Sequence, residues 1–200
     1  MSLATEAAEA SQRIVLVRHG ETEWSRVNRH TGRSDIALTA LGEEQARGLA
    51  ATLAGWPFAA VYVSPLQRAR QTCVLAGYGE AAIVEPDLIE WDYGTYEGKT
   101  SAEIQTTQPG WTLFGDGVPG GETLADVAAR AARVIGRVRS VSGDVLLFGH
   151  GHQLRILTAL WLEFAPSAGQ HLQLEPASPS TLGYEHEWTA LLSWNGLHRD

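Results

Sequence analysis

The sequence predicts an α/β protein, a three-layer α/β/α sandwich around a mostly parallel central sheet. Apolar runs of strand length lie near both ends of the chain, at 14–17 and 145–148, and each leads to a histidine beside glycine. Between these runs, short apolar stretches alternate with segments of helical periodicity. Strands that alternate with helices typically build a parallel sheet with helices on both faces.

The first half of the chain alternates two strands with two helices. A strand is expected over 13–17, and a polar, arginine-containing loop follows it. Thr39 is placed to cap a helix that keeps apolar residues at helical spacing through about Leu53. A second strand over 59–63 leads into Ser64-Pro65-Leu66-Gln67. That run supplies an N-cap serine, a proline at the first helical position and a glutamine three residues after the cap, so it predicts a helix start.

The middle of the chain is rich in glycine. A short third strand is expected over 81–84, and 90–100 is a glycine- and aromatic-rich loop. Positions 101–121 are expected to be irregular, and we interpret 100–122 as a lid-like insertion. Thr123 to Asp126 resembles a capping signal for a helix over 124–139. The arginines of this helix, Arg130, Arg133 and Arg137, are typical of a solvated face.

The last part of the chain returns to a strand and a helix, expected over 144–148 and 153–164. Three further strand candidates follow, at 171–174, 181–184 and 188–194. The sequence contains no internal repeat and no linker-like stretch. We therefore expect one domain over 13–195, preceded by a flexible N-terminal segment over 1–12.

Composition limits the possible partners and location. Fifteen Lys and Arg against 23 Asp and Glu give a net charge of −8, which disfavours binding to nucleic acid or an anionic membrane. Lys99 is the only lysine, so an anionic ligand would need a local pocket built from arginine. No run approaches the length of a membrane span, and the N-terminus lacks a secretory pattern, so we expect a cytoplasmic protein. The single cysteine, Cys73, is expected to be a buried apolar side chain.

Two histidines follow two of the predicted strands. Arg18-His19-Gly20 ends the first strand, and Gly149-His150-Gly151 ends the strand near the C-terminus. Open α/β sheets bind ligands beyond the carboxyl ends of their strands. With Arg68 in the first turn of a helix that also follows a strand, these residues predict a cage for a tetrahedral dianion.

These residue types suit phosphoryl transfer. A neutral imidazole is a competent nucleophile, and nearby arginines should lower the pKa of His19 and keep it neutral. Arg18 and Arg68 can fork onto phosphoryl oxygens, and His150, if protonated, adds a donor. Glu90 is the best candidate for a general acid, because partial burial beside aromatic residues would raise its pKa.

Six ordered motifs resemble the histidine phosphatase superfamily, whose members share the phosphoglycerate mutase-like fold. They span about 13–160 and run Leu16-Val17-Arg18-His19-Gly20-Glu21-Thr22-Glu23-Trp24, Thr31-Gly32-x-x-Asp35-Ile36-x-Leu38-Thr39-x-x-Gly42, Ser64-Pro65-Leu66-x-Arg68-Ala69-x-Gln71-Thr72, Glu90-Trp91-x-Tyr93-Gly94-x-Tyr96-Glu97-Gly98, Gly120-Gly121-Glu122-Thr123 and Gly149-His150-Gly151. The Glu90–Gly98 stretch is most similar to the acid phosphatase and sugar-bisphosphate phosphatase branch.

The resemblance implies a phosphohistidine at His19, with Glu90 as proton donor and later base. It implies that Arg18, Arg68 and His150 hold the phosphoryl group, and it implies no metal and no cofactor. Further candidates for substrate contact are Thr31, Gly32 and Gly151. Many relatives carry an asparagine at the position of Ser25, and Asn28 does not simply inherit that role.

The resemblance leaves the reaction open among three possibilities. We expect a phosphatase acting on a small phosphorylated metabolite, of sugar phosphate or phosphoglycerate type. A cofactor-dependent phosphoglycerate mutase is the first alternative, although the insertion is short and between 90 and 121 offers only Lys99 as a cation. A non-catalytic module that binds a phosphorylated partner is the second. A homodimer is the commonest assembly for such a chain.

Several other signals were weighed. Gly94 to Thr100 is one residue too short between its glycines for a Walker A loop. The pair His150-x-His152 lacks further ligands at metal-binding spacing, and His152 is better interpreted as a supporting residue. The aromatic residues around the insertion could form a substrate wall or pack the insertion onto the sheet: Trp91, Tyr93, Tyr96, Trp111 and Phe114. At least two of Arg26, Arg29 and Arg33 are expected to be exposed, and Asp35 and Glu122 are expected to fix loops.

Overall fold

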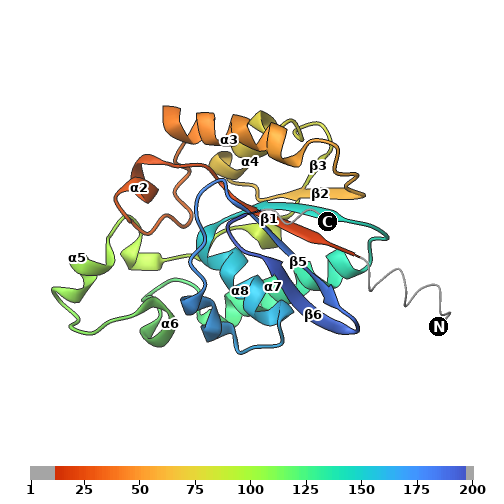
Figure 1. Cartoon of the computed structure of the whole chain (residues 1–200). Coiled ribbons are helices and arrows are strands. Elements are labelled where there is room, and N and C mark those ends of the chain that lie inside the picture. The colour runs from red at the N-terminus through yellow and green to blue at the C-terminus, as the bar shows by residue number, and fades with distance from the viewer. Residues whose placement is uncertain (1–11, 197–200) are drawn as a thin grey trace.

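The computed structural model describes residues 12–196, and its centre is a six-stranded sheet (Figure 1). The strand order is β3-β2-β4-β1-β5-β6. The strands are β1 (Ile14–Arg18), β2 (Ala60–Val63), β3 (Ala82–Val84), β4 (Val145–Gly149), β5 (Pro179–Glu185) and β6 (Trp188–Ser193). The first four strands pair in parallel, β5 pairs antiparallel with β1, and β6 pairs antiparallel with β5. The expected segment 1–12 lies almost wholly outside the described residues.

Helices cover both faces of this sheet. Figure 1 shows α3 and α4 above it and α7 and α8 below it, so the expected three-layer α/β/α fold is confirmed. The α-helices are α2 (Glu23–Arg26), α3 (Ala40–Leu53), α4 (Gln67–Leu75), α5 (Ser101–Gln105), α6 (Leu113–Asp116), α7 (Leu124–Arg139) and α8 (Gly151–Trp161). Short 3₁₀ helices cover Pro86–Leu88, Gly94–Tyr96 and Pro166–His171.

The two central strands bring the distant histidines to one edge. Every residue of β4 is buried, as are the first four of β1, which is typical of strands covered on both faces. The register pairs Arg18 with Gly149, so β1 and β4 end side by side. The residues that follow, His19 and His150, therefore leave the sheet at the same point.

Threonine caps set the start of several helices. The Thr39 side chain accepts a hydrogen bond from the Gly42 N–H, so the predicted start of α3 is confirmed. Thr123 and Asp126 form a capping box at the start of α7, which confirms the predicted signal there.

The predicted cap at Ser64 is wrong. The N-cap of α4 is Leu66, which makes no side-chain cap, and the helix begins at Gln67. The Ser64 hydroxyl does accept a 3.3 Å bond from the Leu66 N–H, but its closer partner, at 2.6 Å, is a ring nitrogen of His150. The Ser64 hydroxyl therefore binds His150, at the end of the neighbouring strand, instead of capping α4.

The stretch 101–121 is not wholly irregular, because it contains α5 and α6. Thr100 and Glu103 form a capping box at the start of α5, and Thr112 caps α6. These short helices were missed because each has few residues over which periodicity can be detected.

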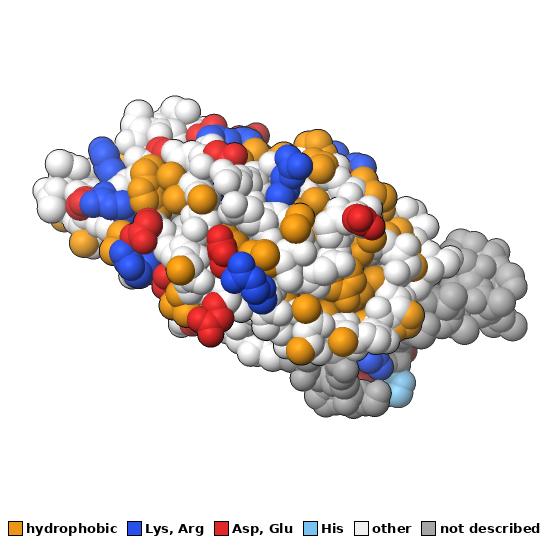
Figure 2. Space-filling model, turned by 90° about the horizontal axis from the view of Figure 1, so that it is seen from above, with side chains coloured by type: hydrophobic (Ala, Val, Ile, Leu, Met, Phe, Trp, Pro, Cys, Tyr) orange, Lys and Arg blue, Asp and Glu red, His pale blue; other side chains and the backbone are white. Residues whose placement is uncertain are grey.

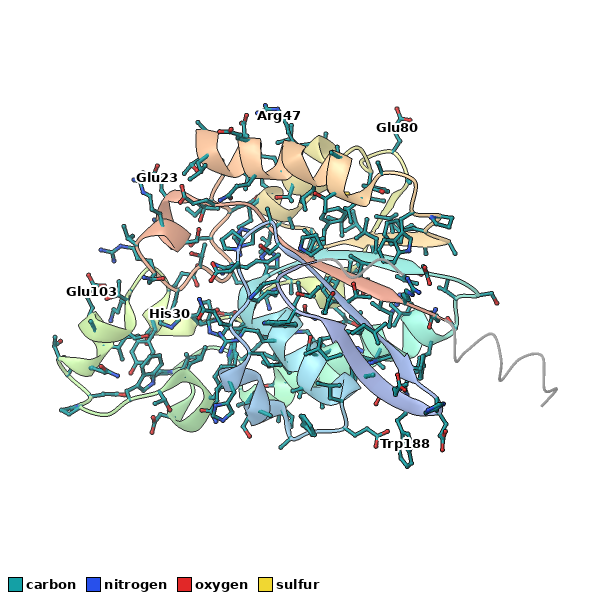
Figure 3. All side chains as sticks on the ribbon, in the orientation of Figure 1. Glu23, His30, Arg47, Glu80, Glu103 and Trp188 are labelled. Atoms are coloured by element: carbon teal, nitrogen blue, oxygen red, sulfur yellow. The ribbon has the colours of Figure 1, made fainter. Side chains whose placement is uncertain are left out.

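The C-terminal part differs from expectation at two places. The segment 171–174 is not a strand, because the carbonyl of Gln173 accepts hydrogen bonds from the side chains of Trp194 and Asn195. Helix α8 begins two residues earlier than expected, at Gly151, and ends at Trp161. The last two predicted strands are confirmed as the β5–β6 hairpin, from which Trp188 projects (Figure 3).

The arginine stripe of α7 is not simply solvated. Arg130 is buried and pairs with Glu122, with Nε 2.8 Å from Oε1. Arg133 and Arg137 are about half exposed but pair with Asp87 and Glu85. All three arginines thus attach α7 to the 85–90 segment or to the end of the insertion.

Two remaining features bear on the sequence predictions. Cys73, on α4, is buried against the sheet and α3, as expected, and burial raises the pKa of its thiol to about 12. Within 12–196, no helix is both long enough and apolar enough to cross a membrane. The face seen in Figure 2 intersperses acidic and basic side chains.

Candidate active site

The two histidines that end β1 and β4 face each other. The ring centroids of His19 and His150 are 5.2 Å apart, and both side chains are buried. The sheet register described above causes this juxtaposition, so the spatial convergence expected from the sequence is present.

His19 is held as a neutral imidazole with a defined tautomer. Its Nδ1 lies 2.7 Å from the carbonyl oxygen of Gly20, which can only accept, so Nδ1 carries the proton. Burial, together with the positive charges of Arg68 and Arg18, lowers the pKa of His19 well below its usual value. Nε2 is therefore unprotonated and available as a nucleophile.

Close backbone packing fixes the Gly20 carbonyl. A Cβ atom on Gly20 would lie 2.4 Å from the carbonyl oxygen of Gly42, and one on Gly42 would lie 2.1 Å from that of Glu21. The Gly20 N–H also donates to the Thr72 hydroxyl on α4 at 3.0 Å. The start of α3 thus presses directly on the loop that carries His19.

Arg18 presents an unsatisfied donor to the site. Its Nη1 donates to the Leu174 carbonyl at 2.6 Å, but its buried Nε has no hydrogen-bond partner. A Cβ on Gly151 would lie 3.5 Å from that Nε and 3.8 Å from Oε2 of Glu90. A buried guanidinium N–H without a partner costs free energy, and an anion there would satisfy it.

Arg68 is buried beneath the site and makes four hydrogen bonds. Nη1 and Nη2 donate to the carbonyls of Ser34, Thr31 and Gly32 at 2.8–3.0 Å. Nε donates to Nδ1 of His150 at 3.2 Å. Arg68 therefore joins the predicted loop around 31–34 to the second histidine.

His150 is neutral and not the protonated donor considered from the sequence. Its Nδ1 accepts from Arg68, so Nε2 carries the proton and donates to the Ser64 hydroxyl at 2.6 Å. Burial and the charge of Arg68 lower the pKa of His150 well below its usual value. A dianion bound nearby would oppose this shift and favour protonation of the ring.

Glu90 sits at the N-terminus of α8. Its Oε1 accepts from the backbone N–H groups of Trp91 and Gln153, both at 2.9 Å, and Oε2 accepts from the His152 N–H at 3.1 Å. Its main-chain carbonyl lies 3.5 Å from Nη2 of Arg130. These contacts hold the carboxylate in one orientation, with Oε2 beside Gly151.

A cavity of about 310 Å³ opens above these groups. Of the predicted residues, Arg18, His19, Glu90, Thr31 and Gly151 line it. Arg68, His150 and Gly32 do not line it, although His150 contacts the ring of His19, and the Gly32 N–H donates to Glu97. The cavity wall also includes residues that were not among the predicted site residues: Ser25, Asn28, Arg29, His30, Tyr93, Ser101, Leu113, His152, Arg155 and Leu174.

A buried polar cluster forms one side of the cavity. The Tyr93 hydroxyl lies 2.6 Å from Nδ1 of His152, and His30 stacks on His152 with ring centroids 6.3 Å apart. Figure 3 shows His30 inside the molecule, whereas Glu103 of α5 projects outward. The contact with Tyr93 agrees with the interpretation of His152 as a supporting residue, which stays a prediction because His152 also lines the cavity.

The aromatic residues of the insertion pack in the interior. Trp91, Tyr93, Tyr96 and Trp111 are buried in the core cluster beneath the insertion, and Phe114 packs against it. Of these, Tyr93 alone lines the cavity. The packing interpretation is therefore correct for most of them.

The loop arginines are half exposed and paired, and the expected loop-fixing carboxylates make backbone contacts. Arg26, Arg29 and Arg33 pair with Glu23, Glu103 and Asp92, respectively. Asp35 accepts from the Gln67 N–H at 2.7 Å, and Glu122 accepts from the Asp92 N–H at 2.9 Å.

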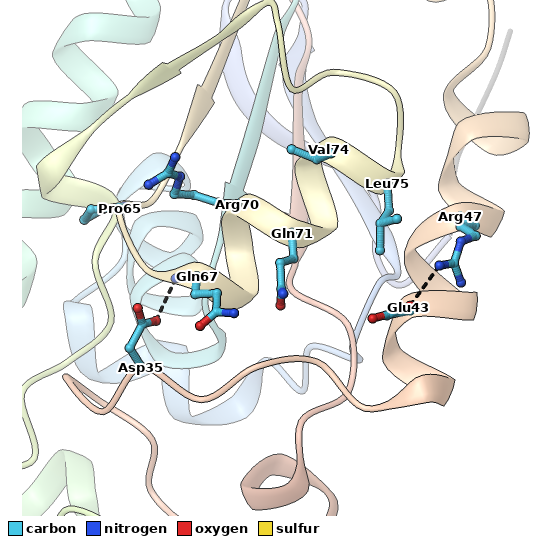
Figure 4. Close-up of a pocket in the computed structure, with 9 residues that line it drawn as sticks. All are labelled: Asp35, Glu43, Arg47, Pro65, Gln67, Arg70, Gln71, Val74 and Leu75. Carbon is cyan, nitrogen blue, oxygen red and sulfur yellow. Dashed lines mark hydrogen bonds and ion pairs between the residues drawn. The ribbon is translucent and has the colours of Figure 1, made fainter.

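A second hollow, of about 500 Å³, lies between α3 and α4 (Figure 4). Of its charged groups, Arg47 pairs with Glu43 and Asp35 binds the Gln67 N–H, and Arg70 is exposed. No histidine lines this hollow. The reacting groups are gathered in the smaller cavity.

The fold and the site together define a class of phosphate-handling α/β enzymes. A neutral histidine with an unprotonated Nε2, a second histidine and two buried arginines meet where parallel strands end, beside the N-terminus of a helix.

Comparisons with known proteins place the chain within this class. Residues 14–196 match the family model of the histidine phosphatase superfamily (branch 1), and the chain belongs to this family. It is 37% identical over 181 residues to an acid phosphatase of Mycobacterium tuberculosis, with 88% of each chain covered. It is 32% identical to the sedoheptulose 1,7-bisphosphatase of Saccharomyces cerevisiae, over 74% of this chain and 67% of that protein.

Other relatives include a probable phosphoglycerate mutase of Photorhabdus laumondii, 32% identical with 88% of this chain and 87% of that protein covered. Among solved structures, the product of an open reading frame of M. tuberculosis superposes with a TM-score of 0.87 at 35% identity. That match covers 93% of this chain and 98% of the other. The family predicted from the six motifs is confirmed.

Proposed function

We propose that this protein is a metal-independent phosphatase that hydrolyses small phosphomonoesters, of sugar phosphate or phosphoglycerate type, through a phosphohistidine intermediate. One observation carries the proposal. The Gly20 carbonyl holds the proton of His19 on Nδ1, which leaves the Nε2 lone pair free to attack phosphorus.

In the first step, Nε2 of His19 forms a bond to phosphorus, and the bond from phosphorus to the ester oxygen breaks. Glu90 gives a proton to the leaving oxygen, which departs as an alcohol. In the second step, Glu90 takes a proton from water as the water oxygen attacks phosphorus. Inorganic phosphate leaves, Nε2 of His19 is free again, and Glu90 is protonated for the next cycle.

The site supplies positive charge where the transition state needs it. The unpartnered Nε of Arg18 is available to a phosphoryl oxygen. Arg68 and His150 lie beneath His19, and a bound dianion that protonates His150 would gain a further donor. Such preorganised donors are usually the largest contribution to catalysis of this kind.

The names of the relatives support hydrolysis of phosphomonoesters. The acid phosphatase and the sugar bisphosphatase described above both match most of this chain. A mutase would use the same phosphohistidine but return the phosphoryl group to a bound acceptor instead of to water.

Hydrolysis of p-nitrophenyl phosphate in excess chelator tests the proposal. We expect turnover that is unaffected by the chelator and abolished in His19→Ala, with His186→Ala on the exposed hairpin as the matched control. Substrate phosphate should label the wild-type protein in an acid-labile, base-stable form, and His19→Ala should take up no label. Interconversion of 3- and 2-phosphoglycerate, primed with 2,3-bisphosphoglycerate, at rates far above hydrolysis would instead identify a mutase. Binding without label or turnover would identify a non-catalytic module.

A further inference from the structure

The active-site cavity continues into an outer chamber that the proposed chemistry does not use. This outer chamber, of about 570 Å³, shares with the cavity the residues Arg18, Ser25, Asn28, Arg155 and Leu174. Its remaining wall is the segment 170–176. A substrate phosphorylated at one end can thus place its phosphoryl group near His19 and extend its other end outward.

Arg155 stands where the two chambers join. It follows Gly151 by four residues on α8, so both lie on the same face of the helix, about 6 Å apart along its axis. Gly151 marks the phosphoryl end of the cavity, beside Arg18 and Glu90. The backbone of Arg155 therefore lies about one helical turn farther along α8 than Gly151.

The Arg155 side chain is held in place but keeps donor capacity. Nε and Nη2 donate to the carbonyls of Gly169 and Gln170 at 2.8 and 2.9 Å, and the guanidinium lies over the Phe114 ring, 5.4 Å from its centroid. Among residues 12–196, no carboxylate pairs with it and Nη1 has no hydrogen-bond partner.

The charges around the two chambers leave Arg155 as a free cation beside Arg18. Arg29 also lines the cavity, but its guanidinium pairs with Glu103. Glu175 lines the outer chamber with an exposed side chain, and its Oε1 accepts from Gln173. Arg18 and Arg155 therefore place two positive charges at the junction of the chambers, with Glu90 on the inner side and Glu175 in the outer wall.

We propose that Arg155 is a specificity-determining residue that binds a second anionic group, a carboxylate or a second phosphate, on the leaving-group part of the substrate. The neighbouring polar side chains, Ser25, Asn28 and Gln173, suit the hydroxyl groups of a short polyol chain between the two anions. This inference rests on the proposed function, since it names the class of phosphomonoester that the site selects.

The test compares substrates that differ in one anionic group. 3-Phosphoglycerate and glycerol 3-phosphate differ by a carboxylate in place of a hydroxymethyl group, and fructose 1,6-bisphosphate and fructose 6-phosphate differ by one phosphate. We expect wild type to favour the doubly anionic member of at least one pair by tenfold or more in kcat/KM. The pair that shows the preference identifies the anion.

Substitution of Arg155 should remove this preference. In Arg155→Gln the ratio of kcat/KM within the preferred pair should fall to within about twofold of one, mainly through KM. Arg155→Lys should keep part of this kcat/KM ratio, because the positive charge remains. Arg47→Gln on α3 is the matched arginine control and should leave the ratio as in wild type. A ratio unchanged in Arg155→Gln, or the absence of any preference in wild type, would overturn the inference.

A binding measurement separates this inference from the proposed function. Calorimetric titration of the His19→Ala protein needs no turnover, and there the doubly anionic compound should bind at least tenfold more tightly than its partner. This difference should vanish in His19→Ala combined with Arg155→Gln. If wild type hydrolyses no substrate but the binding difference is present, the proposed phosphatase activity is wrong and the anion site is supported. Hydrolysis of p-nitrophenyl phosphate without any such binding difference would refute the anion site alone.

Discussion

The ring centroids of His19 and His150 lie 5.2 Å apart, and both rings are neutral. Nε2 of His19 and Nδ1 of His150 are unprotonated, so each carries a lone pair. Two neighbouring imidazoles in this state avoid mutual repulsion. One ring can then react with phosphorus while the other keeps Arg68 in place. The following predictions depend on this arrangement and on the packing around it.

Arg68→Ala should lower kcat/KM about a hundredfold or more, because removal of a preorganised charged donor has effects of this size. The substitution also removes the bonds that hold the carbonyls of Thr31, Gly32 and Ser34. Steady-state kinetics with p-nitrophenyl phosphate measures the loss. Arg70→Ala, an exposed arginine on the same helix, is the control. A near-normal rate in Arg68→Ala would show that this guanidinium does not serve the reaction.

As the pH is lowered, kcat/KM should begin to fall only below the pH range in which a free imidazole takes up a proton. Because the pKa of His19 is lowered well below its usual value, the nucleophile stays neutral as the pH falls through 6.5. We expect kcat/KM to show no loss attributable to a group with a pKa near 6.5. Rates measured from pH 4 to pH 8 check this, and a sharp fall centred on pH 6.5 would contradict the buried, neutral state of His19.

Stability should decrease as the pH falls below 6.5. The pKa values of His19, His150 and His152 are all lowered in the folded protein, so the unfolded chain binds more protons below pH 6.5. Each histidine then lowers the free energy of unfolding by up to about 1.4 kcal/mol per pH unit, until the pH reaches the pKa of that histidine in the folded protein. Above pH 6.5 this contribution disappears.

One substitution isolates the contribution of a single histidine. His152→Gln should reduce the slope of the unfolding free energy against pH between 6 and 5, as measured by urea denaturation. The exposed His186→Gln should leave the slope as in wild type. Identical slopes in wild type and His152→Gln would mean that His152 takes up protons equally in both states.

Gly42→Ala should destabilise the protein by about 1–3 kcal/mol and also lower activity, since overpacking against fixed backbone cannot be relieved by a side-chain movement. The new Cβ would lie 2.1 Å from the Glu21 carbonyl oxygen, in the loop that follows His19. Gly48→Ala, in the same helix, has open space at its Cβ and should stabilise by about 0.5–1 kcal/mol. Thermal denaturation of both variants measures these opposite effects, and equal changes would refute the packing argument.

Cys73 should resist thiol reagents until the protein unfolds. Burial raises the pKa of its thiol to about 12, so very little thiolate is present at neutral pH. We expect 5,5′-dithiobis(2-nitrobenzoate) to react with one thiol per chain in denaturant and with almost none in buffer. Rapid reaction of the native protein would show that α4 separates readily from the sheet.

The core of the site could be predicted from the sequence because strand ends are easy to recognise. Arg18, His19 and His150 directly follow apolar runs, and parallel strands bring their carboxyl ends to one edge. Arg155 was missed for a related reason. Its proposed role depends on lying four residues after Gly151 on one helix face, and the helix was expected to begin only at 153.

Long-range polar contacts were harder to predict. Arg130 occupies the same helical spacing as its exposed neighbours, and nothing local indicates that Glu122 and the carbonyls of 87–90 surround it. Ser64 carries a strong capping pattern, yet its hydroxyl binds His150 from another strand end. In both cases the deciding partner is distant in sequence, where propensities and periodicities carry no information.

The reacting groups and the walls of the cavity belong to different parts of the architecture. His19, His150 and Glu90 are anchored to β1, β4 and α8, whereas α6 and the segment 170–176 enclose the space where the alcohol portion of the substrate would lie. Insertions or exchanges in these walls therefore alter which alcohol is accommodated without disturbing the reacting atoms. A lineage with this framework can therefore change the metabolite it accepts by editing these walls together with Arg155 on α8.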